Sequence, residues 1–489
     1  MKTFLALVRQ SRKASLRIVG RLLWSLCLAQ LVASLLLASW FGREARAGFL
    51  GLGEYSIKDE AELGKKFNLL VRSQLPLVED PEISGYVKDI VDRIVKAMPP
   101  QTFPFKTSVI LHNAVNAFAA PAGYVFVNSG LVLNFDSEAE VAGVLAHELA
   151  HVSQRHIAHR IERMQTISIL SIAGMLAGAL LGGKQSEAII VGSAAAGQAA
   201  MLKYSRDDES ESDQVGMNYL IAAGYPPGGL IAGFKKIQKL QWLGGSGTIP
   251  TYLSTHPALQ ERIGYLEQRV ARLPDAYKAR KEDNLRFKRV QTLLRARYSD
   301  PKIALQYFQN AEAKGNWLDI MGKAIVYERL NQMVLAKETF AKAQPLSKDD
   351  PLLLREMGIL AYKTGDFNKA SYLFQRVVLE RRDDLMALFY YARLLGDQGQ
   401  VDQASTYYQR ILQKIPDDSE VHYNYGRLLG QGGKLFPAHL HLTYSALYSN
   451  NRKQTKYHLE QTEHAIRSQD DRSAYEKLKK EYDERAEFW

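Results

Sequence analysis

The chain has 489 residues, of which 46% are hydrophobic and 24% are charged. This is the composition of a globular protein, and the length favours two or three domains. The formal net charge of +11 lies mostly at the N-terminus: residues 1–47 hold eight basic residues and one acidic residue, which leaves 55 basic and 51 acidic residues for the rest. That remainder carries a net charge of only +4, so no nucleic-acid partner is expected.

Residues 1–47 are predicted to be a signal peptide. A basic stretch ends at Arg21, an apolar run covers 22–41, and Ala45-Arg46-Ala47 places small residues where a signal peptidase cleaves. Cleavage is predicted after Ala47. The run is also long enough to span a bilayer, so an uncleaved anchor is the alternative. Under both interpretations the rest of the chain lies outside the cytoplasm.

The single cysteine, Cys27, lies inside the apolar run. The mature chain would therefore have no disulfide and no thiolate metal ligand. A cysteine-free exported protein fits a bacterial periplasm at least as well as a eukaryotic secretory route.

Residues 48–285 are predicted to form one domain in which a small sheet lies among helices. Apolar residues at helical spacing precede position 100, and Asp80-Pro81 is a helix-start signal. Two β-rich runs, 109–111 and 124–127, are separated by the turn Pro121-Ala122-Gly123. The helical pattern returns from Ser137.

This second helical stretch contains His147-Glu148-Leu149-Ala150-His151. His147 and His151 are four residues apart, so both imidazoles lie on one helix face and can bind one tetrahedral ion. Glu148 is placed to take a proton from an attacking water rather than to bind metal. We therefore predict one zinc ion per subunit, with peptide-bond hydrolysis as its chemistry.

Two apolar segments, 167–181 and 188–202, follow the motif and are rich in Gly, Ala and Ser. Each would be roughly 22 Å long as a helix, short of the ~30 Å hydrocarbon core of a bilayer. We expect a hairpin packed within or over the domain. A lid, or a peripheral membrane contact through 167–202, is the alternative.

The third metal ligand must come from elsewhere. A histidine six residues beyond His151 would suit another class of zinc peptidase, but Ile157 is there. A helix predicted over 205–217 offers Glu209 and Asp213, which share a face one turn apart. One of them can bind zinc while the other hydrogen-bonds a ligand imidazole, and the residues alone leave that choice open.

Residues 286–489 are predicted to be an α-helical solenoid of tetratricopeptide repeats. Small residues recur every 34 positions, at Ala324, Gly358, Ala392 and Gly426. A helix pair around Ala304 resembles a degenerate first repeat, and 452–487 would cap the stack. The array is expected to present a concave surface to peptide segments or partner proteins, and a passive spacer is the alternative.

Together the two site segments resemble the HtpX and CAAX-prenyl-protease family of gluzincin peptidases. The motifs that carry the resemblance are His147-Glu148-Leu149-Ala150-His151, Ser205-Arg206 with Glu209 and Asp213, and Ser254-Thr255-His256-Pro257 leading into Arg262-Ile263. The resemblance implies a mainly α fold, with a small β-sheet in the peptidase domain. It also selects Glu209, not Glu211, as the third zinc ligand.

His256 takes a site role from the same resemblance. It is expected either to hydrogen-bond the oxyanion of the tetrahedral intermediate or to occupy the open zinc position and hold the enzyme off. Capping of the helix after Pro257 is the alternative. His156 and His159 lie one or two turns beyond His151 without metal spacing, and we expect them to be structural or solvent-facing.

With its signal peptide and repeats, the chain resembles the periplasmic, repeat-bearing members of that family. This implies an endopeptidase for misfolded or stalled outer-membrane proteins, with repeats that dock substrate or the β-barrel assembly machinery. The strand at 124–127 is expected to pair with extended substrate. A chaperone or scaffold whose repeats are the main activity is the alternative, and an anchored membrane peptidase is a third hypothesis.

Overall fold

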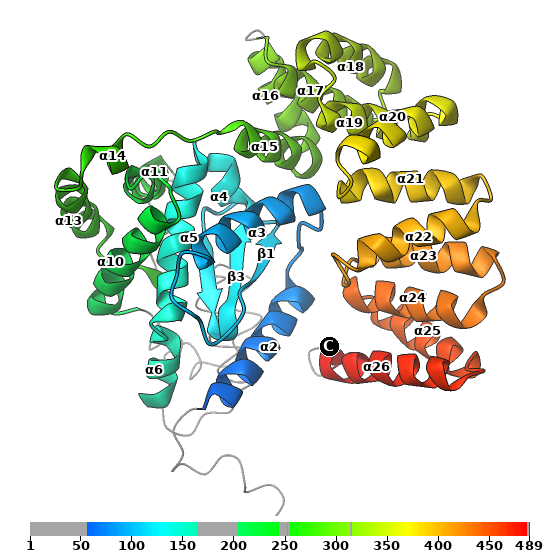
Figure 1. Ribbon diagram of the computed structural model, residues 1–489, viewed down its shortest axis with the longest axis horizontal. Helices are drawn as coiled ribbons and strands as arrows, with labels where there is room; N and C mark the ends of the chain where they lie inside the picture. Colours follow the sequence, from blue (N-terminus) through cyan, green and yellow to red (C-terminus); the bar gives the residue numbers. More distant parts are fainter. Residues whose placement is uncertain (1–55, 164–203, 244–251, 253–254, 313–314, 487–488) are drawn as a thin grey trace, which may run out of the picture. The chain divides into compact units, whose positions relative to one another are not determined.

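The computed structural model describes residues 56–163, 204–243, 252, 255–312, 315–486 and 489 (Figure 1). One compact unit contains Ile57–Arg160 and Ile169–Trp489, and the other contains Met1–Ser56 and Ile161–Ser168. The predicted signal peptide and the apolar segments 167–181 and 188–202 lie outside the described residues. Among the helices that the structure describes, none has the length and apolar character that a membrane span requires.

A three-stranded sheet has the order β1-β3-β2. β1 (Lys106–Ile110) pairs in parallel with β3 (Tyr124–Asn128), and β2 (Ala117–Ala120) pairs with β3 in antiparallel fashion. Because β3 has a partner on each side, both edges of its backbone are already in use. The expectation that 124–127 offers a free edge to substrate is therefore wrong, and β2 is an edge strand instead.

The turn between β2 and β3 is the short helix η1 (Pro121–Gly123). Gly123 has a φ of +81°, and a Cβ built there would lie 2.6 Å from the carbonyl oxygen of Pro104. Only glycine fits both the left-handed backbone and the close approach. The antiparallel register of β2 on β3 therefore depends on this residue.

Five helices come before or after the strands of this sheet along the chain. They are α2 (Ile57–Gln74), α3 (Pro81–Val95), α4 (Ser129–Asn134), α5 (Glu138–Ser153) and α6 (His156–Arg163). Asp80 caps α3 as its sequence signal predicts, because its carboxylate accepts hydrogen bonds from the backbone N–H groups of Glu82 and Ile83. On α2, Phe67 packs edge-on against Phe118 of β2 and Phe126 of β3, with ring centroids 6.3 and 5.8 Å away. These contacts join α2 to the sheet.

Helices α10 (Arg206–Ala222), α11 (Gly228–Leu243), α13 (Leu259–Ala271) and α14 (Asp275–Lys278) follow. α10 and α11 both pack against α5, and glycines allow the close approach. A Cβ built at Gly143 of α5 would lie 2.5 Å from the Cα of Leu230 in α11. As a result α5 is enclosed, and residues Ala139–His151 of this helix are buried.

The remaining helices form a stack of antiparallel pairs that follows the chain from green to red in Figure 1. They are α15 (Leu285–Tyr298), α16 (Pro301–Glu312), α17 (Trp317–Arg329), α18 (Met333–Ser347), α19 (Pro351–Lys363), α20 (Phe367–Glu380), α21 (Leu385–Asp397), α22 (Val401–Leu412), α23 (Ser419–Gln431), α24 (Leu435–Tyr448), α25 (Arg452–His464) and α26 (Gln469–Ala486). The 34-residue columns mark helix crossings: a Cβ built at Gly358 of α19 would meet the ring of Phe374 in α20 at 2.8 Å.

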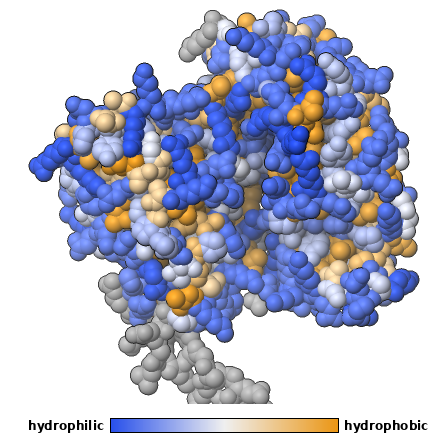
Figure 2. All heavy atoms as spheres, in the orientation of Figure 1, coloured by the Kyte–Doolittle hydropathy of each residue, from blue (hydrophilic) through white to orange (hydrophobic). Residues whose placement is uncertain are grey.

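The predicted fold class, mainly α with a small sheet followed by a helical solenoid, is confirmed. The face shown in Figure 2 is largely hydrophilic, with apolar residues in small groups. The apolar side chains are concentrated in an interior cluster that contains residues of α3, α5, α10, α11 and the sheet.

Candidate metal centre

Helix α5 positions the two histidines of the central motif. Ser137 caps its N-terminus by accepting a hydrogen bond from the backbone N–H of Glu140. His147 and His151 lie one turn apart on one helix face, and their Nε2 atoms are 3.1 Å apart. Both side chains are buried. Two imidazole nitrogens at this separation can share one tetrahedral ion.

Helix α10 brings two carboxylates to these histidines, and a capping box begins it. The N–H of Asp208 donates to the Ser205 hydroxyl, while the N–H of Ser205 donates to the Asp208 carboxylate. One residue further, Glu209 faces the pair: its carboxylate oxygens lie 3.5 Å from His147 Nε2 and 3.6 Å from His151 Nε2.

Asp213, one turn along α10, approaches the other side of the His147 ring. Its Oδ1 atom lies 3.0 Å from Nδ1 of His147. The two carboxylates that the sequence left as alternatives thus lie differently against the histidines. Glu209 faces both Nε2 atoms, whereas Asp213 contacts the nitrogen of His147 that points away from them.

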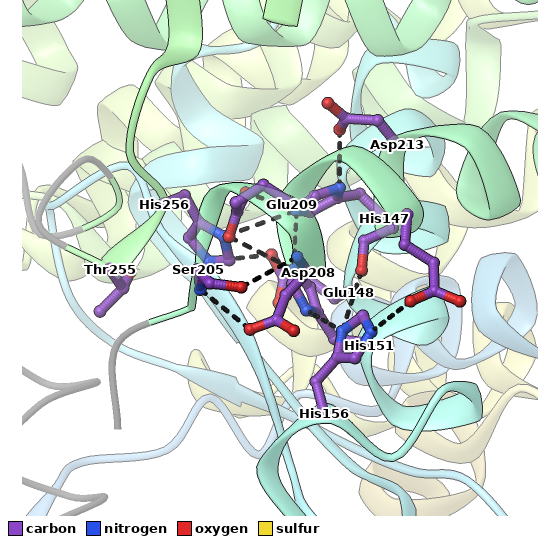
Figure 3. Close-up of polar contacts among 12 residues, drawn as sticks. His147, Glu148, His151, His156, Ser205, Asp208, Glu209, Asp213, Thr255 and His256 are labelled. Carbon is purple, nitrogen blue, oxygen red and sulfur yellow. Dashed lines mark hydrogen bonds and ion pairs between the residues drawn. The ribbon is translucent and has the colours of Figure 1, made fainter. Parts of the chain in front are cut away.

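His256 completes the group (Figure 3). Its Nδ1 atom lies 2.9 Å from Oε1 of Glu209, and its Nε2 atom lies 3.5 Å from Oε1 of Glu148. One ligand atom from each of His147, His151, Glu209 and His256 falls within 4.8 Å of the others. The helix-capping alternative for His256 does not match the structure, because the residue at the N-cap of α13 is Ala258, without a side-chain cap hydrogen bond.

Arg262 is a site residue whose role sequence reasoning missed. From α13 its guanidinium donates through Nε and Nη2 to the two oxygens of Asp213, at 2.8 and 2.6 Å, and Nη1 forms an ion pair with Glu209. Tyr265 on the same helix donates its hydroxyl proton to Asp213. The sequence placed Arg262 in a motif but gave no signal for these contacts.

These contacts set the electrostatics of the two carboxylates on α10. Burial opposes ionisation of Glu209, but His256 and Arg262 outweigh it and hold the pKa well below the usual range. Burial likewise opposes ionisation of Asp213, and the hydrogen bonds from Arg262 and His147 lower its pKa nevertheless. Both side chains are therefore carboxylates at neutral pH, the form that holds a cation or orients an imidazole.

Glu148 has a different environment. Burial raises the pKa of its carboxyl group, and neither carboxylate oxygen makes a hydrogen bond among the described residues. Nε2 of His256 is also buried without a hydrogen bond there. Buried polar atoms without a hydrogen bond are costly unless a metal ion, water or substrate satisfies them. Two imidazoles and a carboxylate beside these atoms are a donor set that fits zinc.

Two tyrosines form aromatic walls, and the sequence did not single them out. Tyr204 stacks on His151 with ring centroids 3.7 Å apart, and Tyr252 stacks on His256 at 4.3 Å. Both rings are buried, and their hydroxyls have no hydrogen-bond partner in the described chain. These stacks restrain the two imidazole planes.

His156, expected to be structural or solvent-facing, lies against the site. His156 is buried, and its Nδ1 atom lies 2.9 Å from Nδ1 of His151. Its Nε2 atom lies 3.2 Å from a carboxylate oxygen of Glu211. His159, by contrast, is solvent-exposed as expected.

A buried helix with two histidines and a glutamate, crossed by a second helix with a carboxylate, defines a metallopeptidase-type site. Residues 81–270 match the model of peptidase family M48, and residues 361–428 match a tetratricopeptide repeat model. The chain thus contains a peptidase M48 domain followed by tetratricopeptide repeats, and the resemblance inferred from the motifs is confirmed.

Several named proteins are similar to this chain in sequence. The chain is 30% identical to a putative beta-barrel assembly-enhancing protease of Vibrio cholerae, over 60% of each chain. It is 30% identical to the beta-barrel assembly-enhancing protease of Escherichia coli, over 42% of this chain and 43% of the relative. A mitochondrial metalloendopeptidase of Arabidopsis thaliana is 34% identical over 33% of this chain and 30% of the relative. The chain therefore matches between 30% and 60% of the length of these relatives.

Proposed function

We propose that the chain is a zinc metalloendopeptidase that degrades misfolded or stalled outer-membrane proteins and assists their assembly. The observation that carries the hydrolytic part is that His147, His151 and Glu209 meet beside the Glu148 carboxyl group, whose oxygens make no hydrogen bond among the described residues. The names of the relatives in Vibrio cholerae and Escherichia coli support the outer-membrane part.

In this proposal His147, His151 and Glu209 hold the zinc ion. When bound there, zinc supplies a Lewis acid that polarises the scissile carbonyl and makes a water molecule acidic enough to lose a proton near neutral pH. Asp213 accepts a hydrogen bond from Nδ1 of His147, which keeps Nε2 free to bind. Arg262 compensates the charges of Glu209 and Asp213, so both remain ionised in a buried site.

Glu148 is the proposed general base and acid. Its carboxylate accepts a proton from the attacking water and then delivers it to the nitrogen of the leaving amine. Burial raises the pKa of this carboxyl group, which makes it a stronger base than an exposed glutamate. Its oxygens make no hydrogen bond in the described residues that would compete for the proton.

His256 is the proposed third participant, and its position suits either role given to it. Nε2 lies beside the Glu148 carboxylate, where the carbonyl oxygen of a substrate would develop negative charge. Nδ1 contacts Glu209, so the ring is also close enough to the proposed ligands to occupy a fourth metal position. The second role would hold the enzyme inactive until His256 is displaced.

Substrate would bind in an extended form along β2 once this strand, whose residues are at most 2% exposed, is uncovered. This edge strand pairs with β3 on one side, and no strand of the described residues pairs with its other side. Main-chain pairing there would accept many sequences, as degradation of unfolded proteins requires. Ala120 and Pro121 line a small pocket together with His151, which connects this end of β2 to the metal centre.

The repeats are proposed to dock substrate or the β-barrel assembly machinery, since arrays of this kind present a concave surface. Export to the periplasm with cleavage after Ala47, and a peripheral membrane contact through 167–202, remain proposals on residues outside the described part of the chain. A chaperone or scaffold that uses the repeats as its main activity is the second candidate.

The test is Glu148→Gln in the full chain, with Glu138→Gln in the first turn of the same helix as the matched control. The variant at Glu148 should keep zinc but lose cleavage of an unfolded outer-membrane protein, whereas the control should cleave normally. Retained turnover would overturn the peptidase assignment. Full rescue of a deletion strain by Glu148→Gln would favour the scaffold instead.

A further inference from the structure

The chain turns sharply directly after the second histidine of the motif. Helix α5 ends at Ser153, Arg155 takes a left-handed backbone with a φ of 54°, and α6 begins at His156. The Arg155 guanidinium donates through Nε and Nη2 to one carboxylate oxygen of Glu60 in α2, at 3.1 and 2.8 Å. The ion pair with α2 thus holds the turn between α5 and α6 in place. The turn brings His156 against the His151 ring.

His156 and Glu211 continue a line of polar contacts that starts at His151. Nδ1 of His151 is 2.9 Å from Nδ1 of His156, and Nε2 of His156 is 3.2 Å from Oε2 of Glu211. The hydroxyl of Ser212, also on α10, lies 3.3 Å from Nδ1 of His156. Helix α10 therefore supplies Glu209 to one nitrogen of His151 and supports the other nitrogen through His156.

When metal is bound to His151, only one arrangement of protons allows hydrogen bonds along the line from His151 through His156 to Glu211. Nε2 of His151 faces His147 and Glu209, so it must be free of a proton to act as a ligand, and Nδ1 must carry the proton. That N–H donates to Nδ1 of His156. His156 then carries its own proton on Nε2, which donates to the carboxylate of Glu211.

We propose that His156 and Glu211 are positioning residues that fix the tautomer and orientation of His151 and so strengthen zinc binding. The proposal rests on the zinc-binding role given to His151 above. It gives each ligand histidine its own support: Asp213 contacts His147 directly, whereas Glu211 acts on His151 through the ring of His156.

The two members of the pair should contribute unequally. His156 is 4% exposed and contacts the ligand ring itself, while the side chain of Glu211 is 54% exposed. Water partly replaces the hydrogen bond of an exposed carboxylate, but it cannot reach a ring packed inside. Loss of the buried ring should therefore weaken zinc binding far more than loss of the charge on Glu211.

The experiment compares zinc affinity of the full chain and four variants by competition with a chromophoric chelator. His156→Leu should weaken binding by about 10- to 100-fold, the range for partners of metal ligands. Glu211→Gln should weaken it only severalfold, and His156→Gln, which retains an acceptor and a donor, should recover part of the loss. His159→Gln, an exposed histidine on the same helix, is the matched control and should bind as the parent does.

Cobalt substitution gives a second measurement that does not depend on turnover. The visible absorption bands of bound Co²⁺ should shift in His156→Leu and remain at the parent positions in His159→Gln. Unchanged affinity and spectrum in His156→Leu, or an equal loss in His159→Gln, would overturn the proposal. If His156→Leu does not fold, Glu211→Gln and His156→Gln carry the test, and parent affinity in both would overturn it as well.

These outcomes distinguish a failure of the positioning role of His156 and Glu211 from a failure of the proposed function. A parent chain that binds no zinc would refute the metallopeptidase assignment itself. A parent chain that binds zinc and cleaves protein, with His156 variants of unchanged affinity, would refute only the positioning role.

Discussion

Gly216 of α10 faces the backbone of His147 in α5 with no space between them: a Cβ built at Gly216 would lie 2.9 Å from the Cα of His147. The helix that carries Glu209 and Asp213 thus touches the helix that carries the two histidines at the site itself. The separation of the two helices, and with it the distance from Glu209 to the histidines, is set by the missing side chain.

Gly216→Ala should therefore weaken zinc binding and lower stability. Alanine is favoured over glycine within a helix by roughly 1 kcal/mol, so without the steric contact the change would stabilise the protein. Here α10 must move away from α5, and Glu209 moves with it. We expect zinc affinity to fall by about tenfold or more, as when a partner of a ligand is lost.

The matched control is Gly264→Ala in α13, where a Cβ would meet nothing within 4 Å. This change should raise the melting temperature slightly and leave zinc affinity unaltered. If both variants behave alike in calorimetry and in zinc titration, close packing at Gly216 does not control the site.

Arg262→Gln should destabilise the metal-free protein strongly. It leaves Glu209 and Asp213 buried without their compensating charge, and breaking a buried ion pair on one side costs about 3–5 kcal/mol. Bound zinc would replace part of that positive charge. The rise in melting temperature on adding zinc should therefore be larger in the variant than in the parent.

Arg269→Gln is the control for this prediction, because Arg269 lies on the same helix and donates to Gln214 and Asn218 at an exposed site. It should change the free energy of unfolding by less than about 0.5 kcal/mol. An equal effect of the two substitutions would contradict the argument from buried charge.

Removal of the metal should lower the melting temperature of the parent chain. A ligand present at a thousand times its dissociation constant stabilises the folded state by about 4 kcal/mol. Glu148→Gln should show the same shift on chelation, since Glu148 is not a proposed ligand. His151→Gln should show little or none, and a full shift in that variant would remove His151 from the ligand set.

The last repeats contain a pair of histidines that should make the protein sensitive to acid. Nδ1 of His422 in α23 is 2.8 Å from Nδ1 of His441 in α24. Burial lowers the pKa of His422 to about 4, against the opposing hydrogen bond to the carbonyl of Pro416 and the charge of Asp417. Burial and the neighbouring His422 lower the pKa of His441 to about 3.

The sign of the effect follows from these directions. Both pKa values are lower in the folded state than the 6.5 of an ordinary histidine. Burying the two neutral rings therefore costs no stability for protonation reasons above about pH 6.5. Stability is lost as the pH falls from about 6.5 toward 4, by roughly 1.4 kcal/mol per histidine for each tenfold rise in proton concentration. His441→Phe should reduce the loss in thermal melts at pH 7.5 and 5, whereas the exposed His464→Gln should not.

Much of the site followed from spacing along the sequence. The helical repeat placed His147 beside His151 and Glu209 beside Asp213, because residues four apart share a helix face whatever the surrounding fold. Arg262 could not be assigned in this way, since its contacts with Asp213 depend on how α13 packs against α10. Tyr204 and Tyr252 likewise reach the site only through tertiary packing.

Two expectations failed for identifiable reasons. His156 was expected on the same helix as His151, but α5 ends at Ser153 and the chain turns at the left-handed Arg155. β2 escaped notice because Ala117-Phe118-Ala119-Ala120 is short and rich in alanine, which strands disfavour. Without β2, the central strand β3 looked like an edge.

The close contact of α5 with α10 also bears on when the proposed protease activity could damage other proteins. The proposed base and two proposed ligands belong to one helix, and the third ligand is 58 positions beyond His151. An unfolded or half-folded chain therefore has no complete metal site. It cannot cleave neighbouring copies that are still unfolded themselves. Hydrolytic capacity would arise only in molecules that have completed their own folding.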